Sequence, residues 1–145
     1  MSSDTHSISN TNTITRQLVP EEQRTQVTAD LFGVYFPLQL EPFVFSMASR
    51  LSDDYGGGYW LFYTLGNGGF YMAPDSDGKF QVVSPNGWEG FMSGDAFGIT
   101  VSLFAYSNLS FGSGQFAETC AEQYHLLRDY MMDHAEAGAI LAATD

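Results

Sequence analysis

Apolar residues in the first third of the chain recur every three or four positions, which is the period of an α-helix that buries one face. A first helix is predicted to begin at Pro20, because proline followed by two glutamates suits the first turn of a helix, and to end at about Gly33. A second helix is predicted over residues 37–51. Its buried face would consist of apolar residues at helical spacing, namely Val44, Met47, Ala48 and Leu51.

The pattern changes to that of β-strands in the segment GGGYWLFYTLGNGGFYMAP, residues 56–74. Two aromatic-rich runs flank Asn67–Gly68, and this dipeptide favours a tight hairpin because both residues tolerate positive φ. A two-residue loop predicts that Leu65 lies opposite Phe70, which fixes the rest of the pairing. Both faces of the hairpin would then be apolar or aromatic, so we expect each face to be partly covered or an aromatic patch to be left for a partner.

Two further turn signals, Asp77–Gly78 and Asn86–Gly87, come before apolar runs. These runs predict strands over residues 80–84 and 88–92. Because four consecutive strands are joined by short turns, we expect them to form an antiparallel meander.

The last third of the chain is predicted to be helical. A largely uncharged helix over residues 94–109, with Ser93 or Asp95 as its cap, comes before a longer helix that begins near Phe116. Placing residues at about 100° each around the longer helix gathers acidic side chains opposite its apolar face. This acidic stripe consists of Glu118, Glu122, Asp129, Asp133 and Glu136, together with His125. It is interpreted either as a solvated outer face or as a contact surface for a partner.

Together these elements predict an α+β fold in which a four-stranded antiparallel meander packs with about four to five helices. Residues 1–18 are rich in Ser, Thr and Asn and are predicted to be a flexible tail, while residues 19–145 are predicted to form a single domain. The tail lacks the basic start and the apolar run of a signal peptide. The single cysteine, Cys120, fits a reducing compartment, so we expect a cytoplasmic protein without a membrane segment.

The chain is strongly acidic, with 17 acidic and 5 basic residues and a formal net charge of −12. Stable direct binding of nucleic acid is not expected, because binding to a phosphate backbone requires clustered Lys and Arg. The charge favours a basic protein surface as partner, and solubility alone is the other explanation.

The motifs of common catalytic sites are missing from the sequence. The only Gly-Lys pair, Gly78–Lys79, is followed by phenylalanine where a P-loop has Ser or Thr. Cys120 and His125 would point about 140° apart on one helix, which separates a thiol from its base. One cysteine and scattered histidines give no pattern of metal ligands. We therefore expect no catalytic residue, metal or cofactor, and the alternative of a small enzyme would rest on Asp53, Asp54 or His125.

Several longer motifs are more specific than these short patterns. They are GGYW from Gly57, NGGFYMAP from Asn67, SGDAFG from Ser93 and the final AILAATD. In these segments the chain resembles the KlcA/ArdB antirestriction family. The resemblance implies a protein of plasmids and genomic islands that protects incoming foreign DNA by inhibiting type I restriction-modification enzymes. It also implies an α+β fold without catalytic residues, and it supplies no established set of binding residues.

Close mimicry of DNA is the first mechanism to consider for an acidic inhibitor of this kind. A compact chain of this length is about 38 Å across, and duplex DNA of that length carries about 22 negative charges. The protein has a net charge of −12 over its whole surface, so it is a poor copy of DNA. We instead predict contact with a basic patch of the type I restriction-modification complex. An acidic DNA mimic and an indirect regulator acting through a host factor are the alternatives.

The contact residues are predicted from charge and aromatic character. Carboxylates of the stripe would face the basic patch, and Asp145 ends a segment that is too apolar for an ordinary tail. Aromatic side chains at the predicted hairpin would add apolar contact. The predicted partner-binding residues are Glu118, Glu122, Asp129, Asp133, Glu136, Asp145, Tyr59 and Tyr71.

Overall fold

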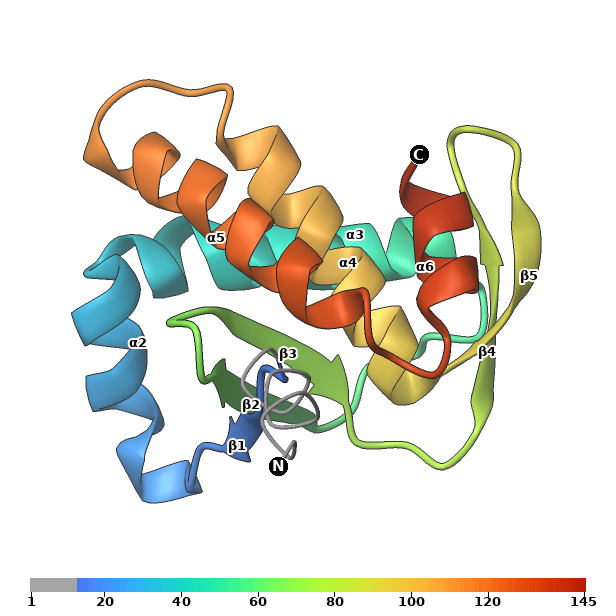
Figure 1. Ribbon diagram of the computed structural model, residues 1–145, viewed down its shortest axis with the longest axis horizontal. Helices are drawn as coiled ribbons and strands as arrows, with labels where there is room; N and C mark the ends of the chain where they lie inside the picture. The colour runs from blue at the N-terminus through green and yellow to red at the C-terminus, as the bar shows by residue number, and fades with distance from the viewer. Residues whose placement is uncertain (1–12) are drawn as a thin grey trace, which may run out of the picture.

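The computed structural model describes residues 13–145 and has an α+β fold, which is the class predicted from the sequence (Figure 1). Its helical segments are η1 (Glu21–Gln23), α2 (Arg24–Phe32), η2 (Phe36–Leu40), α3 (Glu41–Leu51), α4 (Gly94–Leu109), α5 (Gln115–Met131) and α6 (Ala137–Thr144). Its strands are β1 (Arg16–Leu18), β2 (Trp60–Leu65), β3 (Phe70–Pro74), β4 (Lys79–Val83) and β5 (Glu89–Ser93). All the predicted helices are present, and α6 follows them.

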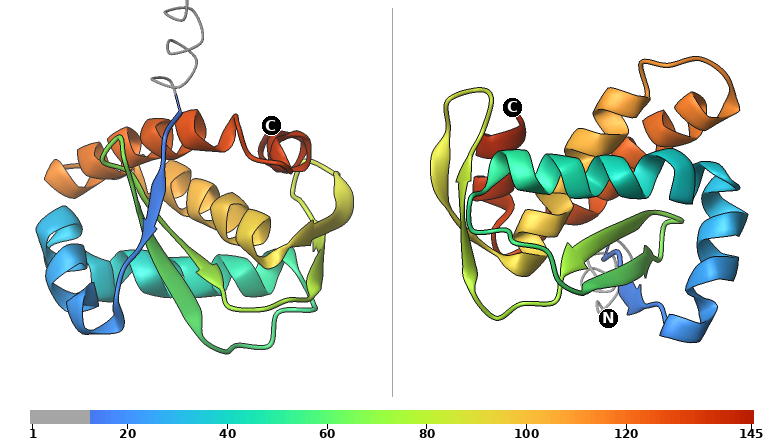
Figure 2. Two further views of the ribbon diagram at one scale, coloured as in Figure 1. Left: turned by 60° about the horizontal axis from the view of Figure 1, so that its bottom comes forward. Right: turned by 180° about the vertical axis from the view of Figure 1, so that it is seen from behind.

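Helix α4 lies at the centre of the molecule, between α3 and α5 (Figure 2). It also contacts α6, β3, β4 and β5. Eleven of its 16 residues are buried, as expected for a helix whose only charged residue is Asp95. The predicted cap is confirmed at Ser93, whose Oγ accepts a hydrogen bond from the Ala96 N–H at 3.1 Å.

The four predicted strands are present, but they do not form one meander. They are divided between a three-stranded antiparallel sheet, in the order β1-β2-β3, and a two-stranded antiparallel ribbon, β4-β5. The reason is that α4 covers the outer edge of β3. The Tyr106 hydroxyl donates to the Phe70 carbonyl oxygen at 2.7 Å, and the Ser102 hydroxyl lies 3.4 Å from the Met72 carbonyl oxygen. Strand β4 therefore has no free edge of β3 to pair with.

The register of the β2–β3 hairpin differs by one residue from the prediction. Thr64, and not Leu65, lies opposite Phe70. The loop has three residues, because the Leu65 N–H donates to the Gly69 carbonyl at 2.9 Å and Gly68 alone takes up positive φ, at 95°. The Asn67 side chain instead accepts from the Gly69 N–H and donates to the Leu126 carbonyl of α5, which ties the loop to that helix.

The last three residues of the predicted tail, which was expected to span residues 1–18, form a strand in the structure. Residues Arg16–Leu18 form β1, which pairs with β2 so that Arg16 lies opposite Leu65. Sequence pattern did not indicate this strand because its three side chains are all exposed and have no apolar alternation. The rest of the predicted tail, residues 1–12, lies outside the described residues.

The close packing of α4 on β3 gives a first testable prediction. A Cβ atom on Gly98 would lie 2.3 Å from the Ala73 Cβ and 2.5 Å from the Met72 carbonyl oxygen, so a side chain there must push the helix and strand apart. Gly98→Val is expected to lower the free energy of unfolding by about 3 kcal/mol or more, measured by urea denaturation. Gly138→Ala is the control, because its Cβ would meet open space on α6. Equal stabilities of the two variants would contradict the prediction.

Candidate functional site

The outward face of α5 carries three carboxylates that are available to a partner. Glu118, Glu122 and Asp129 are exposed, while Leu127 and Met131 are buried on the opposite side of the helix. Within residues 13–145, none of the three carboxylates has a side-chain hydrogen bond or an ion pair. The structure therefore presents the central part of the predicted acidic stripe to solvent, with His125 exposed among the carboxylates.

The stripe is shorter than predicted because α5 ends at Met131. Asp133 is exposed in the turn that follows the helix. Glu136 turns inward, where its carboxylate accepts hydrogen bonds from the Ser93 N–H at 2.9 Å and the Ser93 hydroxyl at 2.5 Å. Its prediction as a surface contact is therefore corrected: Glu136 connects the start of α6 to the end of β5.

Two further predicted contact residues are accessible but already have partners in the fold. The side chain of Asp145 is 68% exposed, and its Oδ1 lies 3.9 Å from Nη1 of Arg128. Tyr59 is 49% exposed, and its hydroxyl donates to Oε1 of Glu21 at 3.0 Å. The Arg24 guanidinium lies 4.7 Å from the centre of the Tyr59 ring. Any partner at these positions would compete with weak surface contacts.

Tyr71 is not a surface residue, contrary to the prediction. Its side chain is completely buried, and its ring stacks between those of Tyr63 and Tyr130, with centres 5.1 and 5.9 Å away. The hydroxyl accepts from Nη1 of Arg16 at 2.6 Å and donates to Oδ1 of Asp95 at 2.8 Å. Burial is the main reason that the pKa of Tyr71 is raised, with the charge of Asp95 adding to it, so the phenol stays protonated.

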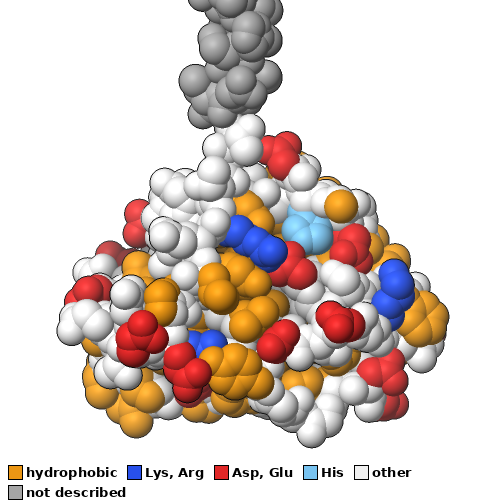
Figure 3. Space-filling view, turned by 90° about the horizontal axis from the view of Figure 1, so that it is seen from below, with side chains coloured by type: hydrophobic (Ala, Val, Ile, Leu, Met, Phe, Trp, Pro, Cys, Tyr) orange, Lys and Arg blue, Asp and Glu red, His pale blue; other side chains and the backbone are white. Residues whose placement is uncertain are grey.

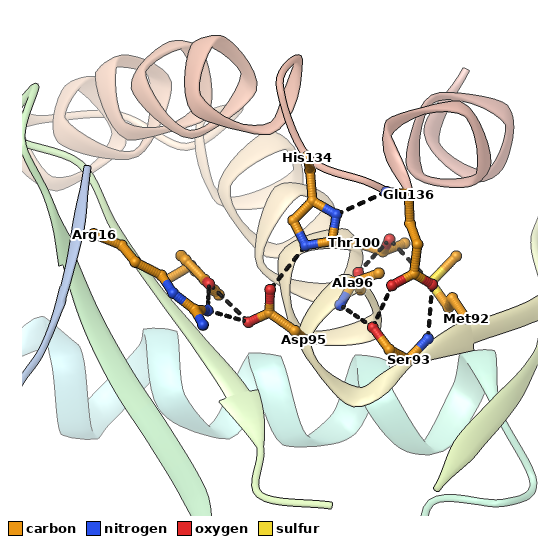
Figure 4. Close-up of polar contacts among 9 residues, drawn as sticks. Arg16, Met92, Ser93, Asp95, Ala96, Thr100, His134 and Glu136 are labelled. Atoms are coloured by element: carbon orange, nitrogen blue, oxygen red, sulfur yellow. Dashed lines mark hydrogen bonds and ion pairs between the residues drawn. The ribbon is translucent and has the colours of Figure 1, made fainter. Parts of the chain in front are cut away.

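Asp95 is the centre of a polar network that joins β1, β3, α4 and the connection between α5 and α6 (Figure 4). Besides Tyr71, it accepts from Nη1 of Arg16 at 2.7 Å and from Nε2 of His134 at 2.8 Å. Burial acts to raise the pKa of Asp95, but the hydrogen bonds from His134 and Tyr71 and the charge of Arg16 outweigh it, so the pKa lies below its ordinary value. Acidic, basic and histidine side chains gather beside an apolar area on the face seen in Figure 3.

His134 is held with both ring nitrogens occupied. Nδ1 accepts from the Glu136 N–H at 2.9 Å, so the nitrogen that donates to Asp95 is Nε2, as in the neutral Nε2–H tautomer. A histidine in this state has no free lone pair with which to remove a proton from a substrate. The nearby Ser93 hydroxyl is likewise engaged by Glu136 and the Ala96 N–H. This arrangement supports a structural role for the network. Nothing in the sequence indicated it, because Asp95 and His134 are 39 positions apart.

A cleft of about 430 Å³ lies between α2, η2 and β2. Thr28, Phe36 and Phe62 line it, together with Arg24 and Glu41. Burial raises the pKa of Glu41, and the charge of Arg24 acts in the opposite direction. The volume is within the range of ligand-binding clefts, but the cleft combines no acid–base pair with a nucleophile.

The groups on which a small enzyme would rest do not come together. Asp53 and Asp54 line a separate hollow next to Arg50, where Oδ2 of Asp54 accepts from the Gln81 N–H at 2.8 Å. His125 is on the outward face of α5 and does not line that hollow. Burial raises the pKa of the Cys120 thiol to about 11, which makes it a poor nucleophile near neutral pH.

Within residues 13–145, no three His, Cys, Asp or Glu side chains are grouped so that they could hold a metal ion. In the same residues no single helix is long and apolar enough to cross a membrane. The segments Glu21–Phe32 and Phe36–Leu51 reach that length and composition only when taken together, and the chain bends by 95° between them.

Comparison with known proteins gives consistent results for sequence and structure. Residues 53–145 match the family described as antirestriction proteins. The chain is 38% identical to an antirestriction protein KlcA of Escherichia coli, over 91% of this chain and 95% of that protein. It is 41% identical to the uncharacterized protein YfjX of Escherichia coli strain K12, over 88% and 85% of the two chains.

A solved structure resembles this fold with a TM-score of 0.84 and 38% sequence identity, covering 91% of this chain and 95% of the other. It comes from work on the KlcA and ArdB proteins, for which a novel fold and antirestriction activity against type I DNA restriction systems in vivo but not in vitro are described.

The Asp95 network predicts an acid-sensitive contribution to stability. Because the pKa of Asp95 is lowered on folding, its contribution is fully present above about pH 4, the ordinary range of an aspartate, and is lost as the pH falls through the lower pKa of the folded state. Asp95→Asn is expected to reduce the free energy of unfolding by about 2 kcal/mol at pH 7 and by less at pH 3, measured by urea denaturation.

The matched control for this experiment is Asp77→Asn, because Asp77 is exposed. It should unfold like the parent protein at both pH values. A difference between Asp95→Asn and the parent protein that stays the same from pH 7 to pH 3 would show that the carboxylate charge is not what stabilises the network.

Proposed function

The chain belongs to the antirestriction protein family, as its sequence motifs predicted, and on that premise we propose that it protects incoming unmodified DNA from type I restriction-modification enzymes by contacting protein. We place this activity in the bacterial cytoplasm, where such enzymes meet foreign DNA, and we infer a gene carried by plasmids or genomic islands. The observation that carries the proposal is the agreement in sequence and fold, over nearly the whole chain, with proteins active against type I systems in vivo.

Charge density favours contact with a protein surface over mimicry of DNA. From Glu118 to Asp129, α5 is about 16 Å long, and duplex DNA of that length carries about 10 negative charges. The outward face of the helix offers three carboxylates over the same distance. Three separated charges suit a few Lys or Arg side chains on a protein, whereas a DNA-binding channel recognises a continuous line of phosphates.

We propose that the inhibition involves no catalysis by this chain. Support comes from the engaged nitrogens of His134, the buried Cys120 thiol, and the separation of His125 from Asp53 and Asp54. The protein would then act by occupying a surface in stoichiometric amounts. Its effect should depend on its concentration relative to that of the partner.

A second mechanism, action through a host factor, has one specific observation in its favour. The structurally similar KlcA and ArdB proteins are described as active in vivo but not in vitro. A requirement for an additional cellular protein would explain that difference, as would a requirement for a state of the restriction enzyme that forms only in cells. Both explanations keep protein contact as the working step.

Charge reversal on α5 tests the proposed contact. The triple variant Glu118→Lys, Glu122→Lys, Asp129→Lys should lower the plating efficiency of unmodified phage by at least about tenfold in a strain that has a type I system and expresses the protein, because like charges would then face a basic partner. Tagged parent protein, purified from cells during restriction, should retain a partner that the triple variant loses.

The control variant is Asp53→Lys, Asp75→Lys, Asp77→Lys, which makes the same change in net charge at exposed positions outside α5. It should protect phage DNA like the parent protein. If the folded α5 variant protects as well as this control, the acidic face of α5 is not the contact surface.

A further inference from the structure

Four of the nine large hydrophobic side chains that are exposed in residues 13–145 belong to two connections, α2–α3 and α4–α5, that lie at one end of the molecule (Figure 1). Val34, Tyr35 and Leu38 project from the corner where the chain passes from α2 to α3, and they are 60%, 43% and 65% exposed. Phe111, 86% exposed, belongs to the connection between α4 and α5, and this connection lies at the same end, where its residues 112–114 line a hollow together with Tyr35 (Figure 1). We call these four residues the apolar corner. Exposed apolar residues grouped in this way are typical of interaction sites.

The apolar corner is built into the fold. Gly33 ends α2 with φ at 62°, which turns the chain sharply. The following π-helical segment η2 buries Phe36 and Leu40 while it leaves Leu38 outside. Tyr35 stacks on Phe116 of α5, with ring centres 5.0 Å apart. Short π-helical segments are rare and occur frequently at functional sites. The backbone that carries Val34 and Leu38 is thus fixed by the fold, and the Tyr35 side chain is held by Phe116.

Hollows border the corner on several sides. Val34 lines both the cleft next to α2 and a hollow of about 280 Å³ that reaches Phe116. Tyr35 separates this hollow from another, of about 350 Å³, next to residues 112–114. Projecting apolar side chains between hollows form a surface that can interlock with side chains of another protein.

The charges around the corner are mainly negative. Exposed Asp30 and Glu118 are next in sequence to Leu31 and Thr119, which line the hollow between α2 and α5. Among the residues that line the three hollows, Arg24 is the single cation, and it is engaged by the Trp60 carbonyl at 2.7 Å and by the Phe62 ring. A partner that covers the corner therefore meets apolar side chains with an acidic rim.

We propose that the apolar corner is the docking surface for a partner protein that presents apolar side chains ringed by Lys or Arg. This inference rests on the proposed function, and it names the surface that supplies affinity while the α5 carboxylates supply charge complementarity. The corner adjoins α5, because Phe116 and Thr119 of that helix line the same hollow as Val34 and Tyr35, so one partner can cover both.

Other occupants fit the surface less well. A second copy of this chain would bring the acidic rim against itself, in a protein with a net charge of −12. DNA and anionic lipid are repelled by the same carboxylates, and neither offers the basic groups that would pair with them. A partner protein with a basic rim satisfies both the apolar residues and the charges.

Removal of the apolar side chains tests the inference. Val34→Ser, Leu38→Ser should lower protection of unmodified phage by about tenfold or more, because truncating central apolar contacts commonly costs that much in affinity. The matched control is Val83→Ser, Met132→Ser, which truncates two side chains that are 50% and 53% exposed elsewhere. The control should protect like the parent protein. Both variants should keep the parental thermal unfolding and sedimentation, because all four side chains are exposed.

A single charge reversal tests the nature of the partner. Asp30→Lys changes the rim outside α5 and should weaken protection several-fold; stronger protection would overturn the assignment of a basic partner. The inference also fails if folded Val34→Ser, Leu38→Ser protects fully, or if the parent protein forms a dimer that this variant abolishes. Loss of protection in the α5 triple variant with full protection by the corner variant would overturn this inference and leave the proposed function standing.

Discussion

The close contact between α4 and β3 is the constraint on which the rest of the structure depends. At Gly98 the helix approaches the strand so closely that a Cβ atom would overlap Ala73, and hydroxyls farther along the helix bind the outer edge of the strand. Because that edge is covered, the chain must start a second sheet with β4. The same contact fixes the N-terminus of α4, so that Asp95 meets Arg16 and His134. Segments from both ends of the chain are thereby held to one helix.

This arrangement gives two different roles to acidic residues in the last third of the chain. Asp95 and Glu136 serve the fold, because they accept hydrogen bonds from groups that would otherwise be buried without partners. Glu118, Glu122 and Asp129 have no such role and face solvent. A net charge of −12 therefore overstates the charge available to a partner. The density of free carboxylates on the outward face of α5 suits a small basic patch better than a channel built for DNA.

The proposed contact surface combines charge and apolar area in adjoining parts of the molecule. Carboxylates on α5 can steer a basic partner and set its orientation, but exposed ion pairs contribute little affinity. The apolar corner around Leu38 offers the kind of contact that contributes more, since burying apolar side chains removes them from water. Both surfaces are exposed. An activity seen in cells but not with purified components, as described for the similar KlcA and ArdB proteins, fits a partner or a partner state that exists only in cells.

The sequence by itself determined the helices that precede α6, a cap at Ser93 or Asp95 and the exposed central face of α5, because each depends on neighbours within one or two helical turns. Its longer motifs also identified the family. Tertiary structure alone decided the burial of Tyr71, the inward turn of Glu136 and the division of the strands into two sheets. These features depend on groups that lie far apart in the chain, and no local pattern records which distant residue will supply a hydrogen bond or cover an edge. The apolar corner belongs to the second kind, because the packing of the helices decides that Val34, Tyr35 and Leu38 stay exposed.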